Sequence, residues 1–523
     1  MLPPGSGARH GTRWSADPYL PLVAPTSYVL TRVGWSLTEG VRVTRRHVRF
    51  QDLDQAGLTR GLQVLEQELA VDATFAPEVL AEAETAAGNP TLPSTDRSDV
   101  PFVTIDPVGS MDLDQALHLE RRGNGFRVWY AIADVAAFVT PGGAIDREAH
   151  RRGQTLYGPE KRIPLHPPVL SEGAASLLPG QLRPALVWSI DLDSTGEGVR
   201  VDVERAMVRS RARHDYVEVQ RQLDAGHADE VFGLLREIGE LRLERERERG
   251  GVSLPLPEQE VEVEDGRWTL TYRQRPATED WNAQISLLTG MGAAEIMLYG
   301  EVGIVRTLPA APERSVKRLR RTAAALHLEW HPDMDYPDFV RSLDPNTGPG
   351  AAMLNACTTL LRGAGYVAFE GGVPEHIEHA AIANEYSHVT APLRRLVDRY
   401  AGEVCVASSV DAEIPEWARG ALPALPKEMA ESDRLAHRYE RGVLDLVEAG
   451  VLASAVGQTY RGVVTDVEEQ DPTEGIVVLA DPAVEAKVTR PAGSTGALPL
   501  GDEVEVRLVE ADVTARKVRF ELT

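Results

Sequence analysis

The chain has 523 residues and a formal net charge of −24, with 79 acidic residues against 55 lysines and arginines. This length allows three or four domains and a substantial core. The net charge opposes long-range attraction of polyanions, so any nucleic-acid site must be a local positive channel. The two cysteines, Cys357 and Cys405, exclude a disulfide framework. Without a membrane-length apolar run or an export signal, we expect a cytoplasmic protein that binds no membrane.

Residues 1–95 are expected to form an N-terminal accessory module. Residues 63–68 and 76–86 have helical patterns, whereas residues 41–50 are basic and extended. These patterns favour a small helical or winged-helix module. Its role is either to guide a ligand to the next domain or to shield that domain. The positive charge for the first role comes from Arg45, Arg46, His47 and Arg49.

Three carboxylates occur within nine residues, at Asp106, Asp112 and Asp114. Two carboxylates about 4 Å apart repel by roughly 4 kcal/mol at an effective dielectric near 20. A hard divalent cation with oxygen ligands relieves this repulsion, so the loop predicts a magnesium site. The alternatives are solvated turn-forming acids and one half of a glycosidase pair. An EF-hand calcium loop fits poorly, because the spacing is wrong and no helix flanks the acids.

The segments around these acids predict an antiparallel ribbon. Residues 101–106 and 113–119 read as strands, so Asp112 and Asp114 are expected on one face. The Asn124-Gly125 pair is the strongest short-range hairpin signal, and it precedes a further strand over residues 126–139. Asp134 on that strand is a candidate fourth carboxylate.

Two long motifs carry a resemblance to a known family. The first runs Thr104-Ile-Asp-Pro, then Asp112-Leu-Asp-Gln-Ala-Leu, with Trp129-Tyr-Ala-Ile-Ala-Asp-Val after it. The second is Tyr386-Ser-His-Val-Thr-Ala-Pro-Leu-Arg-Arg-Leu-Val-Asp398. Their sequence and order, over about residues 97–405, resemble the ribonuclease II family of exoribonucleases.

The resemblance implies a magnesium-dependent enzyme, with manganese as the alternative ion, that hydrolyses RNA from its 3′ end to nucleoside 5′-monophosphates. Two metals about 3.5 to 4 Å apart stabilise the attacking and leaving oxygens in such chemistry. Carried over by position, the metal-organising residues are Asp106, Asp112, Asp114 and Gln115. The catalytic residues are Asp114 and Arg394, whose fork suits phosphoryl charge. The implied RNA contacts are Tyr216, Tyr386, Arg394 and Arg395, with Tyr216 stacking on bases.

Three positions depart from the family pattern. Gln115 stands where the family usually has a fourth aspartate, which removes one charge and puts a second metal in doubt. Gln284 lies where the family has an acidic pair, although Glu279 and Asp280 lie just upstream. Leu254 replaces a stacking phenylalanine. These departures motivate an alternative function, a catalytically impaired family member that binds RNA as a regulator.

The second motif also has a structural reading. Arg394 and Arg395 are expected in the first turn of a helix that starts at Pro392. Cations there oppose the helix dipole, and a bound phosphate explains their presence. His388 is expected to make a structural hydrogen bond and not to act as a base.

Residues 411–452 are expected to contain a connecting helix, since residues 427–452 have helical periodicity. Residues 453–523 hold five short alternating segments, which predict an OB barrel. Their order resembles the S1-type RNA-binding domain, with Tyr460 and Phe520 as candidate stacking residues. A generic barrel for protein contacts is the alternative.

The predicted architecture is therefore a multi-domain α+β protein. Its units are an accessory module at 1–95, a mixed α/β catalytic domain at 96–410, a connecting helix at 411–452 and an OB barrel at 453–523. The expected partner is single-stranded RNA, extended to structured RNA with a 3′ overhang, and the expected state is a monomer.

Overall fold

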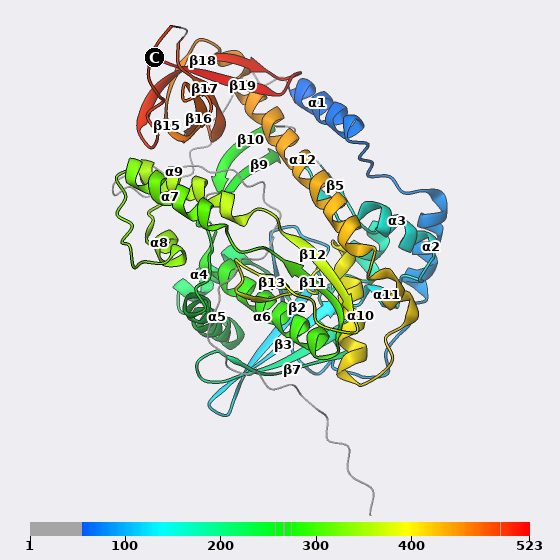
Figure 1. Cartoon of the computed structure of the whole chain (residues 1–523). Coiled ribbons are helices and arrows are strands. Elements are labelled where there is room, and N and C mark those ends of the chain that lie inside the picture. The colour runs from blue at the N-terminus through cyan, green and yellow to red at the C-terminus, as the bar shows by residue number, and fades with distance from the viewer. Residues whose placement is uncertain (1–54, 160, 257, 265–266, 274, 492) are drawn as a thin grey trace, which may run out of the picture.

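The computed structural model describes residues 55–523, apart from residues 160, 257, 265–266, 274 and 492. A mixed α/β body carries a terminal β-barrel, and the long helix α12 (Leu425–Leu452) runs from the body to the barrel (Figure 1). The α+β architecture, the connecting helix and the barrel are confirmed as predicted. The predicted residues 41–50, with their basic side chains, lie outside the described residues.

The centre of the body is a four-stranded antiparallel sheet in the order β2-β3-β6-β7. Its strands are β2 (Gln115–Arg122), β3 (Gly125–Ala133), β6 (Leu182–Leu192) and β7 (Gly198–Arg209). The predicted hairpin at Asn124-Gly125 joins β2 and β3, with Arg122 opposite Gly125. β3 is almost entirely buried because helices and loops cover both faces of the sheet.

Helix α6 (Ala277–Tyr299) passes through the body and is buried over most of its surface. It packs against α5 (Glu230–Glu248), α10 (Leu396–Ser409) and β11 (Val302–Thr307). Glycines permit this close packing. A Cβ at Gly290 would lie 2.1 Å from Cε2 of Tyr386, and one at Gly292 would lie 2.8 Å from a methyl group of Val201.

Smaller elements surround this core. The remaining helices of the body are α3 (Ala144–Arg152), α4 (Tyr216–Asp224), α7 (Glu313–Ala325), α8 (Tyr336–Ser342), α9 (Gly348–Cys357) and α11 (Glu416–Ala421). The remaining strands are β1 (Thr104–Asp106), β4 (Leu156–Tyr157), β5 (Arg162–Ile163), β8 (Arg213–Asp215), β9 (Glu258–Glu264), β10 (Arg267–Arg273), β12 (Gly365–Glu370), β13 (Glu378–His379) and β14 (Asn384–Glu385).

The described part of the N-terminal module consists of α1 (Gln55–Glu68) and α2 (Pro77–Gly88). Both match predicted helices. α1 lies along α12, where Gly442 and Gly450 leave room for Leu65 and Leu58. Over residues 55–95 the structure has no strand, so the winged-helix form is not seen in this range.

The C-terminal barrel is closed, in the order β15-β16-β17-β19-β18. Its strands are β15 (Thr459–Val467), β16 (Glu474–Leu479), β17 (Val484–Thr489), β18 (Glu503–Asp512) and β19 (Lys517–Leu522). Phe520 is fully buried in the barrel core, and half-buried Tyr460 packs edge-on against it at 5.9 Å between ring centroids. The expectation that Phe520 stacks on RNA is therefore wrong, because its ring fills the core.

Candidate active site

A parallel strand pair brings the first acid next to the predicted stacking tyrosine. β1 pairs with β8 so that Asp106 lies opposite Asp215. Asp215 caps α4, since its carboxylate accepts a hydrogen bond from the amide of Glu218 at 2.8 Å. Tyr216 is the first residue of that helix. Burial and the nearby Asp106 carboxylate together raise the pKa of the Tyr216 phenol above its ordinary value.

The second and third acids lie in the loop before β2 and not on it, because β2 begins at Gln115. The predicted shared strand face for Asp112 and Asp114 is therefore wrong. Each of the two acids is instead held by groups from other segments of the chain. Asp112 forms an ion pair with Arg162 and accepts a hydrogen bond from the hydroxyl of Tyr157 at 3.4 Å.

Asp114 is 4% exposed and connects the acidic loop to the segment before α10. Its Oδ1 accepts a hydrogen bond from the backbone amide of Leu393 at 2.7 Å, and its Oδ2 lies 3.3 Å from Nε of Arg394. The two residues predicted to be catalytic, Asp114 and Arg394, are thus in direct contact although 280 positions separate them in the sequence.

Gln115 has partners at both ends of its amide. Its Nε2 donates to the carbonyl of Thr390 at 2.7 Å, and its Oε1 accepts from the hydroxyl of Tyr130 at 2.6 Å. That hydroxyl also lies 2.8 Å from Oγ of Ser286, on α6. The side chain predicted as a metal ligand is therefore a member of a hydrogen-bonded chain.

The acids are buried at an energetic cost. Burial and the Asp112 carboxylate raise the pKa of Asp106 to about 7, and Arg394, Arg213 and Arg162 oppose the shift. Burial raises the pKa of Asp114 to about 8, against the attraction of Arg394. Strongly shifted carboxyl groups that share charge partners are typical of functional sites.

Sequence reasoning missed Arg162 and Arg213 as members of this site. Arg213 precedes Tyr216 by three residues and donates from Nη1 to the carbonyl of Ser110 at 2.8 Å, within the acidic loop. No local pattern marks Arg162, since it reaches Asp112 only through the β4-β5 hairpin. The sequence patterns also did not predict the parallel pairing of β1 with β8, because it joins segments far apart in sequence.

The donor set suits a hard divalent cation, because it consists of carboxylate oxygens. Oδ2 of Asp106 is buried without a hydrogen-bond partner, as expected of an oxygen that a cation completes. Within the described parts of the chain, no group of three or more His, Cys, Asp or Glu side chains is arranged closely enough to hold an ion. Asp112 and Asp114 face arginines in this arrangement, so binding requires them to exchange those partners for the cation.

Two predicted RNA contacts are buried in the protein. Arg395 is 4% exposed, and its Nε and Nη2 donate to Asp398 at 2.9 and 2.8 Å. Tyr386 is also 4% exposed and packs in an apolar cluster with Leu287 and Met291. The structure contradicts a direct RNA contact by Arg395 or Tyr386, because the protein itself covers both side chains.

The expected helix start at Pro392 is also wrong. α10 begins at Leu396, and both arginines precede it. The carboxylate of Asp398 accepts a hydrogen bond from the amide of Ala391 at 2.7 Å, which closes a turn over the intervening residues. The guanidinium group of Arg394 is therefore presented from this turn and not from a helix.

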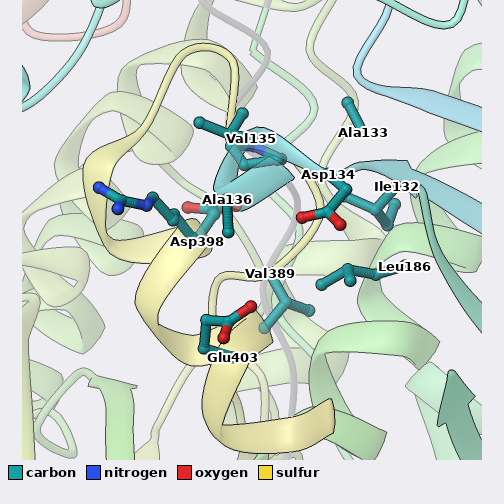
Figure 2. A pocket seen from close by; sticks show the side chains of 11 residues that line it. Ile132, Ala133, Asp134, Val135, Ala136, Leu186, Val389, Asp398 and Glu403 are labelled. Carbon is teal, nitrogen blue, oxygen red and sulfur yellow. The ribbon is translucent and has the colours of Figure 1, made fainter. Parts of the chain in front are cut away.

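Asp134 and His388 serve structural contacts. Asp134 pairs with Arg205 at 2.5 Å and is not a fourth site acid. Figure 2 shows it on a small pocket that Glu403 of α10 also lines. His388, as predicted, is hydrogen-bonded, with its Nδ1 2.7 Å from the hydroxyl of Tyr366. Burial lowers the pKa of its imidazole well below the ordinary value, so the ring is neutral.

The start of α6 supplies further polar groups to the site. Nδ2 of Asn282 donates to the hydroxyl of Tyr216 at 3.1 Å, a contact that sequence analysis did not predict. Glu279 lies 3.4 Å from Arg275 and also pairs with Arg273, so it is already neutralised. Gln284 points to the other side and donates to Glu246 at 2.5 Å. Leu254 packs against the apolar cluster under α7 to α9.

No helix in the described residues combines the length and the apolar character needed to cross a bilayer.

Comparisons with known proteins find similar sequences and similar folds. Ribonuclease R of Escherichia coli (strain K12) is 28% identical over 507 residues, which cover 88% of this chain and 60% of that protein. The chain therefore spans about 60% of the length of this curated relative. Mycoplasma genitalium RNase R, solved with ribose-methylated single-stranded RNA, has a TM-score of 0.79 at 18% identity over 89% of this chain and 78% of its own.

The fold alone does not distinguish an active enzyme from an inactive one. Yeast Ssd1, described as a pseudonuclease, shares the fold with a TM-score of 0.67 at 16% identity, over 86% of this chain and 57% of its own. The question of activity therefore rests on the side chains of the site.

Two family models match in the expected order. The RNB domain matches residues 94–404, and the RNase II-type exonuclease C-terminal S1 domain matches residues 458–523. The first match alone covers more than half of the chain. We conclude that this protein belongs to the RNB-domain family and carries an RNase II-type C-terminal S1 domain.

Proposed function

We propose that the protein is a metal-dependent 3′-to-5′ exoribonuclease that hydrolyses RNA to nucleoside 5′-monophosphates. The observation that carries the proposal is the contact between Asp114 and Arg394, beside Asp106 and Tyr216. Residues from three distant segments thus combine carboxylates, a guanidinium group and an aromatic ring. This combination suits a phosphodiester with its attached base.

Each side chain has a role that follows from its position. Asp106, Asp112 and Asp114 would hold magnesium, or manganese in its place, and the bound ion supplies positive charge and a readily ionised water. Arg394 orients the scissile phosphate and stabilises the charge that develops on it. Before an ion binds, Asp114 holds that guanidinium group in place through its 3.3 Å contact. Tyr216 stacks on a base near the 3′ end, with its hydroxyl fixed by Asn282.

The competing function is RNA binding without cleavage, and Gln115 is its main support. The burial of Asp106 and Asp114 argues against it. Burial of both carboxyl groups costs desolvation free energy, as their raised pKa values show, and a protein that only binds RNA gains nothing from burying acids beside the phosphate. The contact between Asp114 and Arg394 also favours catalysis, because it places a guanidinium group for the phosphate beside the carboxylates.

The proposed substrate is single-stranded RNA, extended to structured RNA with a 3′ overhang. The proposal places the protein in the cytoplasm as a monomer. Both cysteines are buried and free, as in proteins of reducing compartments.

The direct test follows a 5′-labelled single-stranded RNA of about 30 nucleotides over time, with magnesium or with EDTA. We expect stepwise shortening from the 3′ end only with metal, and loss of at least about 100-fold in rate for Asp114→Asn. Asp99→Asn is the matched control, because Asp99 is exposed and close in sequence. RNA that stays intact yet shifts in a gel would favour the binding function, and undiminished cleavage by Asp114→Asn would overturn the site.

A further inference from the structure

Both polar ends of the Gln115 side chain are already engaged. The amide nitrogen donates to Thr390 at 2.7 Å, and the amide oxygen accepts from Tyr130 at 2.6 Å. Tyr130 is 1% exposed, and its hydroxyl is held on the other side by Ser286 at 2.8 Å. We call Gln115, Tyr130 and Ser286 the neutral unit, because none of the three carries a charge in this arrangement.

The acidic loop already has positively charged partners. Three carboxylates, at Asp106, Asp112 and Asp114, face three guanidinium groups, which belong to Arg162, Arg213 and Arg394. One divalent cation adds two positive charges. The RNA phosphate offsets part of this charge, and a carboxylate that releases its arginine partner offsets the rest. A second dication would add two more positive charges, and position 115, where the family usually has a fourth carboxylate, offers only a neutral amide to offset the Coulomb repulsion between the ions.

From these contacts and charges we propose that Gln115 is a positioning residue and not a metal ligand, and that the neutral unit restricts the site to one divalent cation. The inference rests on the proposed function. It deepens that function by fixing the metal stoichiometry of the site.

The positioning role follows from the hydrogen bonds that the consecutive residues Asp114 and Gln115 make. Asp114 binds the amide of Leu393, and Gln115 binds the carbonyl of Thr390. Together they hold both ends of the turn that presents Arg394. Loss of the Gln115 hydrogen bond frees one end of this turn, so Arg394 loses its alignment while the carboxylates keep theirs.

The stoichiometry is tested by titrating EDTA-treated, dialysed full-length protein with Mn²⁺ and measuring free ion by electron paramagnetic resonance. We expect one Mn²⁺ per chain in the parent and in Gln115→Met, with dissociation constants that agree within about threefold. Asp106→Asn is the matched ligand variant and should weaken binding by more than about tenfold. Two ions per chain in the parent would overturn the inference, and so would loss of binding in Gln115→Met.

Tyr130→Phe provides a second route that keeps the amide intact. This change removes the hydroxyl that occupies Oε1 of Gln115. If the amide oxygen were a ligand, its release would tighten Mn²⁺ binding, whereas we expect the dissociation constant to stay within about threefold of the parent. Tighter binding would overturn the inference even where Gln115→Met does not fold.

Kinetics separate positioning from simple damage. For Gln115→Met we expect kcat to fall by about three- to tenfold, the worth of one hydrogen bond, with KM for RNA unchanged. A rise in KM at constant kcat would contradict the positioning role. Failure of the proposed function has a different signature, because a parent that binds no Mn²⁺ and cleaves RNA in EDTA would refute metal dependence itself.

Discussion

The backbone amide of Leu393 donates a 2.7 Å hydrogen bond to the carboxylate of Asp114. This bond fixes the turn before α10 against the loop before β2. Because the donor is a backbone group, no substitution at position 393 except proline removes it. The placement of Arg394 is therefore set by Asp114 as well as by its own segment.

Arg394→Lys should lower kcat by about 100-fold, because an ammonium group cannot make the paired contacts of a planar fork. Equilibrium binding of single-stranded RNA in EDTA should change much less, and a filter-binding assay measures it. Arg221→Lys is the matched control, since the side chain of Arg221 is 71% exposed on α4. Equal losses in both variants would remove Arg394 from the catalytic site.

Tyr216→Ala should raise the KM for RNA by about 10- to 100-fold, since stacking on an aromatic ring contributes about 1–3 kcal/mol per base. Tyr216→Phe keeps the ring and loses only the hydrogen bond from Asn282, so its KM should stay within about threefold of the parent. Steady-state kinetics on a short single-stranded RNA gives both values. A phenylalanine variant as impaired as the alanine variant would assign the effect to the hydroxyl.

Asp106→Asn should make the metal-free protein more stable at pH 8. The pKa of Asp106 is raised from 3.8 to about 7, so between these values the folded chain keeps a proton that the unfolded chain has lost. The parent therefore loses stability as the pH rises toward 7, and the variant does not. We expect a gain of about 1–2 kcal/mol at pH 8 and none at pH 3.8 or below, from urea unfolding in EDTA. A variant less stable than the parent at pH 8 would mean that Asp106 is stabilised in its charged form.

Arg162→Met should tighten magnesium binding and lower the stability of the metal-free protein by about 1 kcal/mol. The change removes the ion-pair partner of Asp112, whose carboxylate is then left for the cation. Urea unfolding with and without magnesium measures both effects, since a bound ion adds stability according to its affinity. Unchanged magnesium stabilisation would show that Asp112 does not reach the ion.

Gly290→Ala should destabilise the protein by about 3 kcal/mol or more. The new methyl group would lie 2.1 Å from Cε2 of Tyr386 and 2.6 Å from the carbonyl oxygen of Ser387, and that backbone cannot move freely. Gly233→Ala, also in a helix, meets nothing within 4 Å and should stabilise by up to about 1 kcal/mol. Thermal unfolding compares the pair, and equal melting temperatures would refute the packing of α6 described above.

Local signals predicted the parts of the fold that depend on near neighbours. The Asn124-Gly125 turn, the helix of residues 427–452 and the five barrel strands all follow from patterns within a few residues. The acidic loop was also visible, because its three carboxylates lie within nine residues.

The errors concern side chains whose partners or burial the sequence patterns did not reveal. Arg395 looked like an RNA ligand, yet Asp398 lies one helical turn away and binds it in the core. The two partners of Gln115 are Thr390, 275 positions further along, and Tyr130 on the neighbouring strand, so no local pattern could reveal that the amide is engaged. Phe520 has the same alternating context as an exposed strand residue, and only closure of the barrel buries it.

The contact between residues 114 and 393 also has a consequence for biosynthesis. During translation the acidic loop emerges long before the turn that carries Arg394. Until that turn has been made and has docked, Asp114 lacks both its amide donor and its guanidinium partner. A nascent chain therefore carries an incomplete centre until residues 393 and 394 have been synthesised and have docked.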